Sequence, residues 1–261
     1  MTKIVSVHSY RGGTGKSNIT ANLATSMALQ GKRVGIVDTD IQSPGINILF
    51  GLGETAIKHT LNDYLWGNCA IKEAAYDVSH IFDGKTGAGS IYLLPSSMKS
   101  DAIARVLSEG YDVELLQTGF YDIAEQLELD YLFVDTHPGI NEETLLSVGI
   151  SNILVLILRP DQQDYLGTAV VLEIADNLDV PHTLLVINKI LPEFEPDLLK
   201  KKAEDAYQRS VAGLIPLATE MMRLGSQGIF CLQYPDHPAS QEFQHIANQI
   251  ESRSTSETTK Q

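Results

Sequence analysis

The chain has 261 residues, which is enough for one large α/β domain with a substantial buried core. Its formal net charge of −14 argues against a broad basic surface that neutralises nucleic-acid phosphates, so we do not expect non-specific DNA binding. The two cysteines, Cys69 and Cys231, are far apart and form no CxxC pair. Nothing therefore supports a zinc knuckle, an iron–sulfur ligand set or a disulfide framework.

The sequence carries no targeting or membrane-spanning pattern. No run of about 18 apolar residues occurs, and the N-terminal residues lack the apolar stretch and the small-residue cleavage site of a secretory signal. We therefore expect a cytoplasmic protein. The segment Ser252–Gln261 is polar and is expected to be a disordered tail that follows a single domain over residues 1–251.

Short apolar runs alternate with longer segments of helical periodicity. The predicted strands are Lys3–Val7, Arg33–Asp38, Ile91–Pro95, Tyr131–Asp135, Ile153–Leu158, Thr183–Asn188 and Val211–Ile215. The predicted helices are Lys16–Gln30, Lys99–Ser108, Val113–Gln126, Glu142–Val148, Tyr165–Asn177, Asp197–Arg209 and Gln241–Ile250. This alternation, with several strands apolar on both faces, predicts an α/β fold: a doubly wound, mostly parallel sheet of about seven or eight strands with helices on both faces.

The first loop has the pattern of a phosphate-binding loop. Tyr10–Ser17 reads YRGGTGKS between a predicted strand and a predicted helix, where glycines let backbone N–H groups turn toward phosphates and the helix N-terminus adds positive charge. Lys16 would contact the β- and γ-phosphates of ATP, and the Ser17 hydroxyl would bind Mg²⁺. A plain glycine-rich turn is the alternative. The other predicted nucleotide-binding residues of this loop are Gly12, Gly13, Thr14, Gly15 and Asn18.

The loop resembles the deviant Walker A sequence of the ParA/MinD family of P-loop ATPases, x-Lys-Gly-Gly-x-Gly-Lys-Ser/Thr. Arg11 stands where that family has its signature lysine, which reaches across a dimer to the partner's nucleotide. Arginine is planar, always charged and binds phosphate well. The resemblance therefore makes Arg11 a predicted catalytic residue that acts in trans, as an arginine finger does. The alternative is a solvated loop charge.

Two later strand ends supply carboxylates. The second strand ends VDTDIQSPG, and two carboxylates there can hold Mg²⁺ through water and orient an attacking water. By resemblance to the family's switch I, Asp40 positions the water and Asp38 supports the metal site; two turn-forming aspartates are the alternative. Asp135, in VDTHPG, resembles the Walker B aspartate of switch II and is a predicted metal ligand, while Gly139 lets the backbone approach the γ-phosphate.

The strand TLLVIN ends at Asn188, whose carboxamide can pair with the edge of adenine. The family has an asparagine followed by a basic residue at this point. The Asn-Lys-x-Asp pattern of GTP-specific relatives lacks its aspartate here, which favours ATP. An asparagine that ends a strand at a turn is the alternative. Pro216 follows Ile215 as in the family's I-P segment, so it is a predicted nucleotide contact.

The resemblance covers Lys3 to about Ile250 and is strongest to the MinD branch, in DTDI, LLPSS and RPDQQDYLGT. It implies a slow ATP hydrolase that uses ATP and Mg²⁺, forms a homodimer with ATP and recruits a protein partner that hydrolysis releases, for intracellular positioning or recruitment. The polar tail lacks the apolar face of a membrane-binding amphipathic helix, so direct membrane binding is not expected.

Two alternative functions stay open. Because Arg11 replaces the signature lysine, the chain can also be read as an ATP-binding regulatory or scaffold protein with little hydrolysis. A metabolic ATP-dependent ligase, as in the dethiobiotin-synthetase branch, would need an additional small-molecule pocket, for which the sequence has no motif. The partner and the biological process are not readable from the sequence.

Overall fold

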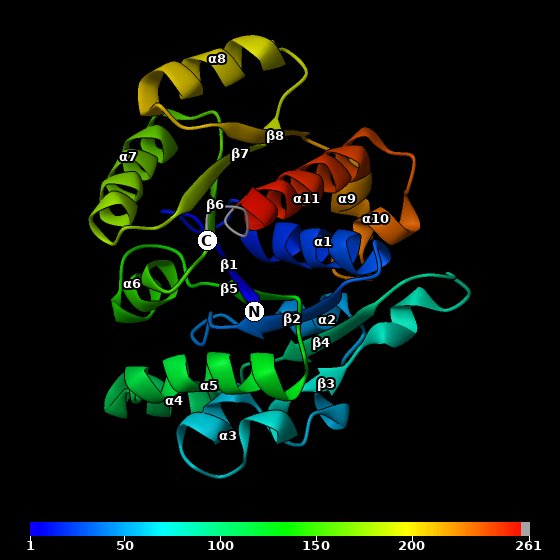
Figure 1. The fold of residues 1–261 in the computed structure, drawn as a ribbon, viewed down its shortest axis with the longest axis vertical. Coiled ribbons are helices and arrows are strands. Elements are labelled where there is room, and N and C mark those ends of the chain that lie inside the picture. Colours follow the sequence, from blue (N-terminus) through cyan, green and yellow to red (C-terminus); the bar gives the residue numbers. More distant parts are fainter. Residues whose placement is uncertain (257–261) are drawn as a thin grey trace.

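The computed structural model of the chain describes residues 1–256, in which one sheet is covered by helices on both faces (Figure 1). Within these residues, eight strands follow the order β3-β4-β2-β5-β1-β6-β7-β8. Every neighbouring pair is parallel except β3 and β4. The predicted doubly wound sheet is therefore confirmed. The strands are β1 (Lys3–His8), β2 (Arg33–Asp38), β3 (Tyr76–Asp77), β4 (Ser90–Leu94), β5 (Tyr131–Asp135), β6 (Ile153–Leu158), β7 (His182–Ile190) and β8 (Val211–Pro216).

The helices form two layers, which Figure 1 shows on opposite sides of the sheet. One layer comprises α1 (Lys16–Leu29), α2 (Ile46–Leu49), α9 (Thr219–Leu224), α10 (Phe230–Gln233) and α11 (Pro238–Ser256). The other comprises α3 (Leu61–Leu65), α4 (Ser100–Glu109), α5 (Val113–Gln126), α6 (Glu142–Gly149), α7 (Gln162–Asn177) and α8 (Pro196–Tyr207). Among the described helices, none is both long and apolar enough to cross a bilayer.

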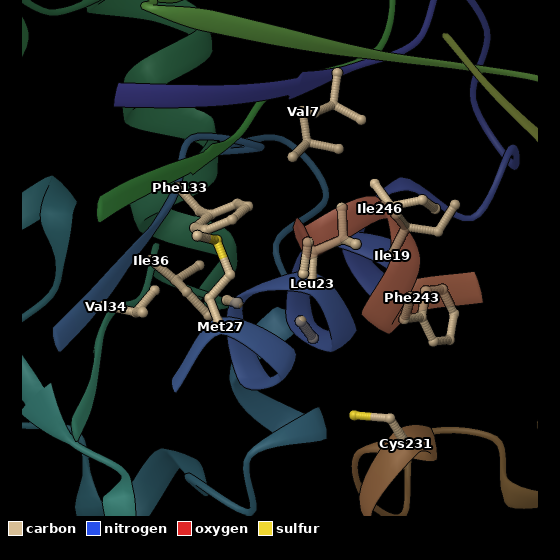
Figure 2. Packing of buried hydrophobic residues seen from close by; sticks show 14 of the residues in the cluster. Val7, Ile19, Leu23, Met27, Val34, Ile36, Phe133, Cys231, Phe243 and Ile246 are labelled. Carbon is tan, nitrogen blue, oxygen red and sulfur yellow. The ribbon is translucent and has the colours of Figure 1, made fainter. Parts of the chain in front are cut away.

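The strands are apolar on both faces because helices cover both faces. In β5 every residue is buried: Phe133 packs toward the α1 layer, whereas Leu132 and Val134 pack toward the opposite layer. Figure 2 shows Phe133 beside Met27 of α1. Nearer the N-terminus of α1, Ile19 lies close to Ile246 of α11 (Figure 2). Helix α1 is thus enclosed between the sheet and α11, which explains why it has almost no polar face.

The sheet order brings three strand ends together. Strand β5 lies between β1 and β2, and its last residue, Asp135, pairs in register with both Val7 and Asp38. The loops that follow these strands therefore meet at the carboxyl edge of the sheet, where open α/β sheets bind ligands.

Several features differ from the sequence predictions, among them the short helices α9 and α10, which were not predicted. Helix α11 continues through Ser256, so the polar segment that begins at Ser252 is helical in its first part; Ser254 is buried and its hydroxyl donates to the Ile250 carbonyl oxygen. The expected start of a disordered tail at Ser252 is therefore wrong, and residues 257–261 lie outside the described residues. The short elements between β2 and β4, such as α3, were not predicted, because periodicity needs a longer window.

Candidate nucleotide-binding site

The loop between β1 and α1 forms a cradle at the carboxyl edge of the sheet. Gly13 and Gly15 have left-handed backbones, with φ of 76° and 94°. Helix α1 begins directly after Gly15, and no described side chain caps its first N–H groups. The loop borders a cavity of 340 Å³. The lining includes Gly12, Gly13, Thr14, Gly15, Lys16, Ser17, Asn18 and Asp40, all of which were predicted, and also Ser9, Ser43, His137 and Pro138.

A buried ammonium group lies between two of the predicted carboxylates. Lys16 Nζ is 3.7 Å from Asp135 Oδ1 and 4.0 Å from Asp40 Oδ2. The Thr20 hydroxyl donates to the same Asp135 oxygen at 3.0 Å. The structure therefore brings the phosphate-loop lysine together with one acid from each of the two switch segments.

The carboxylates fit a nucleotide-bound Mg²⁺. Asp135 Oδ2 is buried and has no hydrogen-bond partner among the described residues. Magnesium in nucleotide sites uses one or two carboxylates, several waters and the phosphates themselves. Within residues 1–256 no group of three or more His, Cys, Asp or Glu residues could hold a metal ion by itself, so such an ion would take its other ligands from the nucleotide and from water.

Asp38 shapes the switch I loop. Its two oxygens accept hydrogen bonds from the backbone N–H groups of Asp40, at 3.1 Å, and Gly45, at 3.2 Å. Burial, and then the negative charge of Asp135, raise the pKa of Asp38 well above its ordinary value. Asp40 is also raised in pKa by burial, although Lys16 acts in the opposite direction. The metal-supporting role of Asp38 stays a prediction.

Arg11 points away from the cavity in this conformation. Its Nη1 lies 3.7 Å from Asp164 Oδ1 and 3.8 Å from Asp161 Oδ1, at the start of α7. Tyr10, which stands where other phosphate loops have a glycine, packs its ring on Gly167 of α7: a Cβ on that glycine would lie 2.0 Å from Tyr10 Cδ1. The front of the loop is therefore held on α7 of the same chain, and the trans role of Arg11 stays a prediction.

The predicted base-binding residues lie on the other side of the loop. Asn188 Nδ2 donates to the Thr14 carbonyl oxygen at 2.7 Å, and Lys189 Nζ donates to the Gly13 carbonyl oxygen at 2.7 Å. Sequence reasoning gave Lys189 no site role, although the Asn-Lys pair signalled it. Pro216 ends β8 opposite Ile190 and is not part of the cavity lining. The contacts of Asn188 and Pro216 with a nucleotide stay predictions.

Two switch II neighbours add to the site. Gly139, with φ of 88°, donates its N–H to the Ser9 carbonyl oxygen at 3.2 Å, so it lies against the phosphate loop. His137 lines the cavity with its Nε2 3.8 Å from Asp40 Oδ1. The sequence analysis gave His137 no role at the site, and the only sequence signal for it is its position between Asp135 and Gly139.

A strand followed by a glycine loop, a buried lysine and two facing carboxylates defines a P-loop NTPase. A family model described as "NUBPL iron-transfer P-loop NTPase" (ParA) matches residues 1–251. The chain therefore belongs to the ParA family of P-loop NTPases, as its resemblance predicted. Within that family its relatives include MinD proteins.

Three similar proteins illustrate the relationship. The chain is 26% identical over 251 residues to an ATP-binding protein of Methanocaldococcus jannaschii, covering 96% of this chain and 88% of that protein. It is 26% identical over 261 residues to the septum site-determining protein MinD of Bacillus subtilis, covering 96% and 89%. The fold matches MinD of Pyrococcus horikoshii OT3, solved with Mg-ADP, with a TM-score of 0.80 at 22% identity over 96% of each chain.

The two cysteines of the chain, Cys69 and Cys231, are both free thiols. Burial raises the pKa of Cys69 to about 11 and that of Cys231 to about 12. In the protein without a bound metal, both thiols are therefore protonated at neutral pH.

Gly15→Ala is expected to weaken nucleotide binding at least tenfold. The added Cβ would lie 2.7 Å from Asn188 Nδ2, in a backbone conformation that L-residues rarely adopt. Titration with a fluorescent ADP analogue measures the loss. Gly84→Ala is the matched control, because Gly84 also has a left-handed backbone, with φ of 80°, but meets no atom within 4 Å. Equal affinities of the two variants would contradict the proposed cradle.

His8→Asn is expected to lower the free energy of unfolding at both pH values. The loss should be smaller at pH 4.5 than at pH 7.5 by about 1 to 3 kcal/mol. Burial, and then the charges of Lys16 and His137, lower the pKa of His8 to about 3. In the unfolded chain His8 therefore takes up a proton near pH 6.5, whereas in the folded chain it stays neutral down to about pH 3. The stability that neutral His8 contributes is lost as the pH falls below about 6.5.

Urea unfolding of the wild type and the variant at both pH values measures this difference. Comparing them at each pH cancels the opposite contribution of Asp38, whose raised pKa stabilises the fold toward low pH. His245→Asn, at an exposed position of α11, serves as the control. A pH-independent effect of His8→Asn would show that His8 does not titrate as described.

Proposed function

We propose that this chain is an ATP-dependent dimerisation switch that hydrolyses ATP slowly and recruits a protein partner while ATP is bound. The observation that carries the proposal is the cluster of Lys16, Asp40 and Asp135 beneath the phosphate loop. Each carboxylate belongs to a different switch segment, so a change of charge at this cluster acts on both loops together.

Different residues of the chain bind the phosphates, hold the metal ion and position the water at such a site. Backbone N–H groups of the loop and the N-terminus of α1 bind the phosphates, and Lys16 turns from its carboxylate partners toward them. Asp135 and Ser17 hold the Mg²⁺, which neutralises phosphate charge when bound. Asp40, at the cavity wall, orients the attacking water.

The position of Arg11 supports a regulated switch. Asp161 and Asp164 lie 3.8 and 3.7 Å from its guanidinium in cis, and both are paired more closely with Arg159, so a role in trans requires Arg11 to leave a loose contact for the phosphates of a partner subunit. The same contact favours the alternative function, an ATP-binding scaffold with little hydrolysis, if the exchange never occurs. Intracellular positioning, the identity of the partner and a cytoplasmic location belong to the proposal.

Light scattering of the Asp40→Ala protein is expected to give a dimer with ATP-Mg²⁺ and a monomer with ADP-Mg²⁺. This substitution blocks hydrolysis, so the ATP state persists during the measurement. Lys16→Gln is the control: it lacks the phosphate-binding ammonium and should remain monomeric with either nucleotide. If ATP binding is measured but the molar mass is the same with ATP and with ADP, the switch mechanism would be contradicted.

Arg11→Ala is expected to lower ATP turnover at least tenfold, because arginine fingers contribute large factors to phosphoryl transfer. Steady-state phosphate release measures this change, with Arg209→Ala as the control on the opposite edge of the sheet, where Arg209 precedes β8. The scaffold function predicts a different pattern: negligible wild-type turnover, no loss in Arg11→Ala and a gain in Arg11→Lys.

A further inference from the structure

His137 lies in switch II with its side chain at the wall of the phosphate-loop cavity. The side chain is 22% exposed, so it is half-buried but open to the cavity. The Thr144 hydroxyl, near the start of α6, donates to the backbone carbonyl oxygen of His137 at 3.4 Å. Thr144 is itself buried. The segment that carries His137 is therefore tied to α6, which gives the imidazole ring a defined place at the cavity.

One hydrogen bond decides which nitrogen of the imidazole ring carries the hydrogen. His137 Nδ1 lies 2.7 Å from the Pro138 carbonyl oxygen. A carbonyl oxygen only accepts hydrogen bonds, so Nδ1 must be the donor. In the neutral ring, Nε2 is then a hydrogen-bond acceptor. Nε2 makes no hydrogen bond within residues 1–256, so this acceptor is available at the cavity wall.

The acceptor faces the carboxylate that we propose orients the attacking water. His137 Nε2 lies 3.8 Å from Asp40 Oδ1, which also accepts the Ser43 backbone N–H at 3.2 Å. The second oxygen, Asp40 Oδ2, lies 4.0 Å from Lys16 Nζ. The two oxygens of Asp40 therefore have different neighbours: Oδ2 faces the lysine and Oδ1 faces the imidazole.

Two acceptors that face each other at this distance require a donor between them. A water molecule has two hydrogens, and at about 2.8 Å from each acceptor it spans a gap of this size. Such water-mediated contacts are nearly as favourable in enthalpy as direct hydrogen bonds. With both hydrogens held, the lone pairs of the water point away from the two side chains and into the cavity that the phosphate loop borders. This is the orientation that attack on a phosphate requires.

We propose that His137 is a second water-positioning residue, which holds the attacking water together with Asp40. This role rests on the proposed ATP hydrolysis at the same site. The water oxygen forms a bond to the γ-phosphorus, while the bond from that phosphorus to the bridging oxygen breaks and ADP leaves with the electron pair. One water proton stays on the phosphate product and the other passes to solvent. His137 fixes the direction of attack and keeps its own hydrogen on Nδ1.

Three substitutions of His137 separate the effect of an acceptor from that of charge or volume. His137→Leu removes the acceptor and should lower kcat roughly tenfold to a hundredfold, with ATP affinity within about twofold of the wild type. His137→Gln restores an acceptor and should recover most of the rate. His137→Lys offers only donors and should be as slow as His137→Leu. His80→Leu, at an exposed position outside the cavity lining, is the matched control. Steady-state phosphate release and titration with a fluorescent ATP analogue measure the two quantities.

A transition-state mimic tests the same contact without turnover. Aluminium fluoride with ADP-Mg²⁺ imitates the phosphoryl group during transfer, and the attacking water completes that complex. Titration with a fluorescent ADP analogue, with and without aluminium fluoride, measures how much the mimic tightens binding. The gain in affinity should be roughly tenfold larger in the wild type and His137→Gln than in His137→Leu. ADP affinity without aluminium fluoride should be the same in all three proteins.

The role of His137 and the proposed hydrolysis fail in different ways. If the wild type neither releases phosphate nor gains ADP affinity from aluminium fluoride, hydrolysis is contradicted and the role of His137 falls with it. If the wild type hydrolyses ATP and His137→Leu is equally fast, only the role of His137 is overturned. An equal gain from aluminium fluoride in these two proteins would overturn it as well. Full activity of His137→Lys would also overturn it, because a charge and not an acceptor would then suffice.

Discussion

The arrangement of the nucleotide-binding site depends on one buried cation, the ammonium group of Lys16. Lys16 carries its ammonium group into the carboxyl edge of the sheet, where a charge without partners would be strongly unfavourable. Asp135 and Asp40 provide the opposite charge from two different strand ends. This pairing constrains the strand order, because β1, β2 and β5 must be neighbours for the three groups to meet. It also prepares a lysine that phosphates can attract when a nucleotide arrives.

The phosphate loop is anchored to the chain around it on two sides. Tyr10 and Arg11 attach its front to α7, while Asn188 and Lys189 hold two of its carbonyl groups from the end of β7. Such anchoring preserves the left-handed glycine backbone without bound phosphate. It also places Arg11 3.7 Å from Asp164, whose carboxylate accepts its hydrogen bonds from Arg159.

The two cavities at this edge of the molecule differ in their physical character. The phosphate-loop cavity has backbone donors and a buried lysine, which suits a highly charged ligand. A second cavity, between the α3 region and α4, is lined by Trp66 and by as many acidic as basic side chains, so its charges do not select an anion. Ser96, which lines that second cavity, donates its hydroxyl to the Asp38 carbonyl oxygen at 2.7 Å, so the cavity lies beside the strand that leads into switch I.

The sequence by itself determined the parallel sheet and most of the loop residues of the site, because strands buried on both faces and a glycine loop before a helix leave local patterns. It could not show that Arg11 rests on Asp164, that Lys189 holds Gly13, or that Trp66 borders a cavity. Those contacts join segments far apart in the chain. Only the packing of α7, β7 and α4 around the sheet decided them, since a side chain's partner depends on which elements become neighbours.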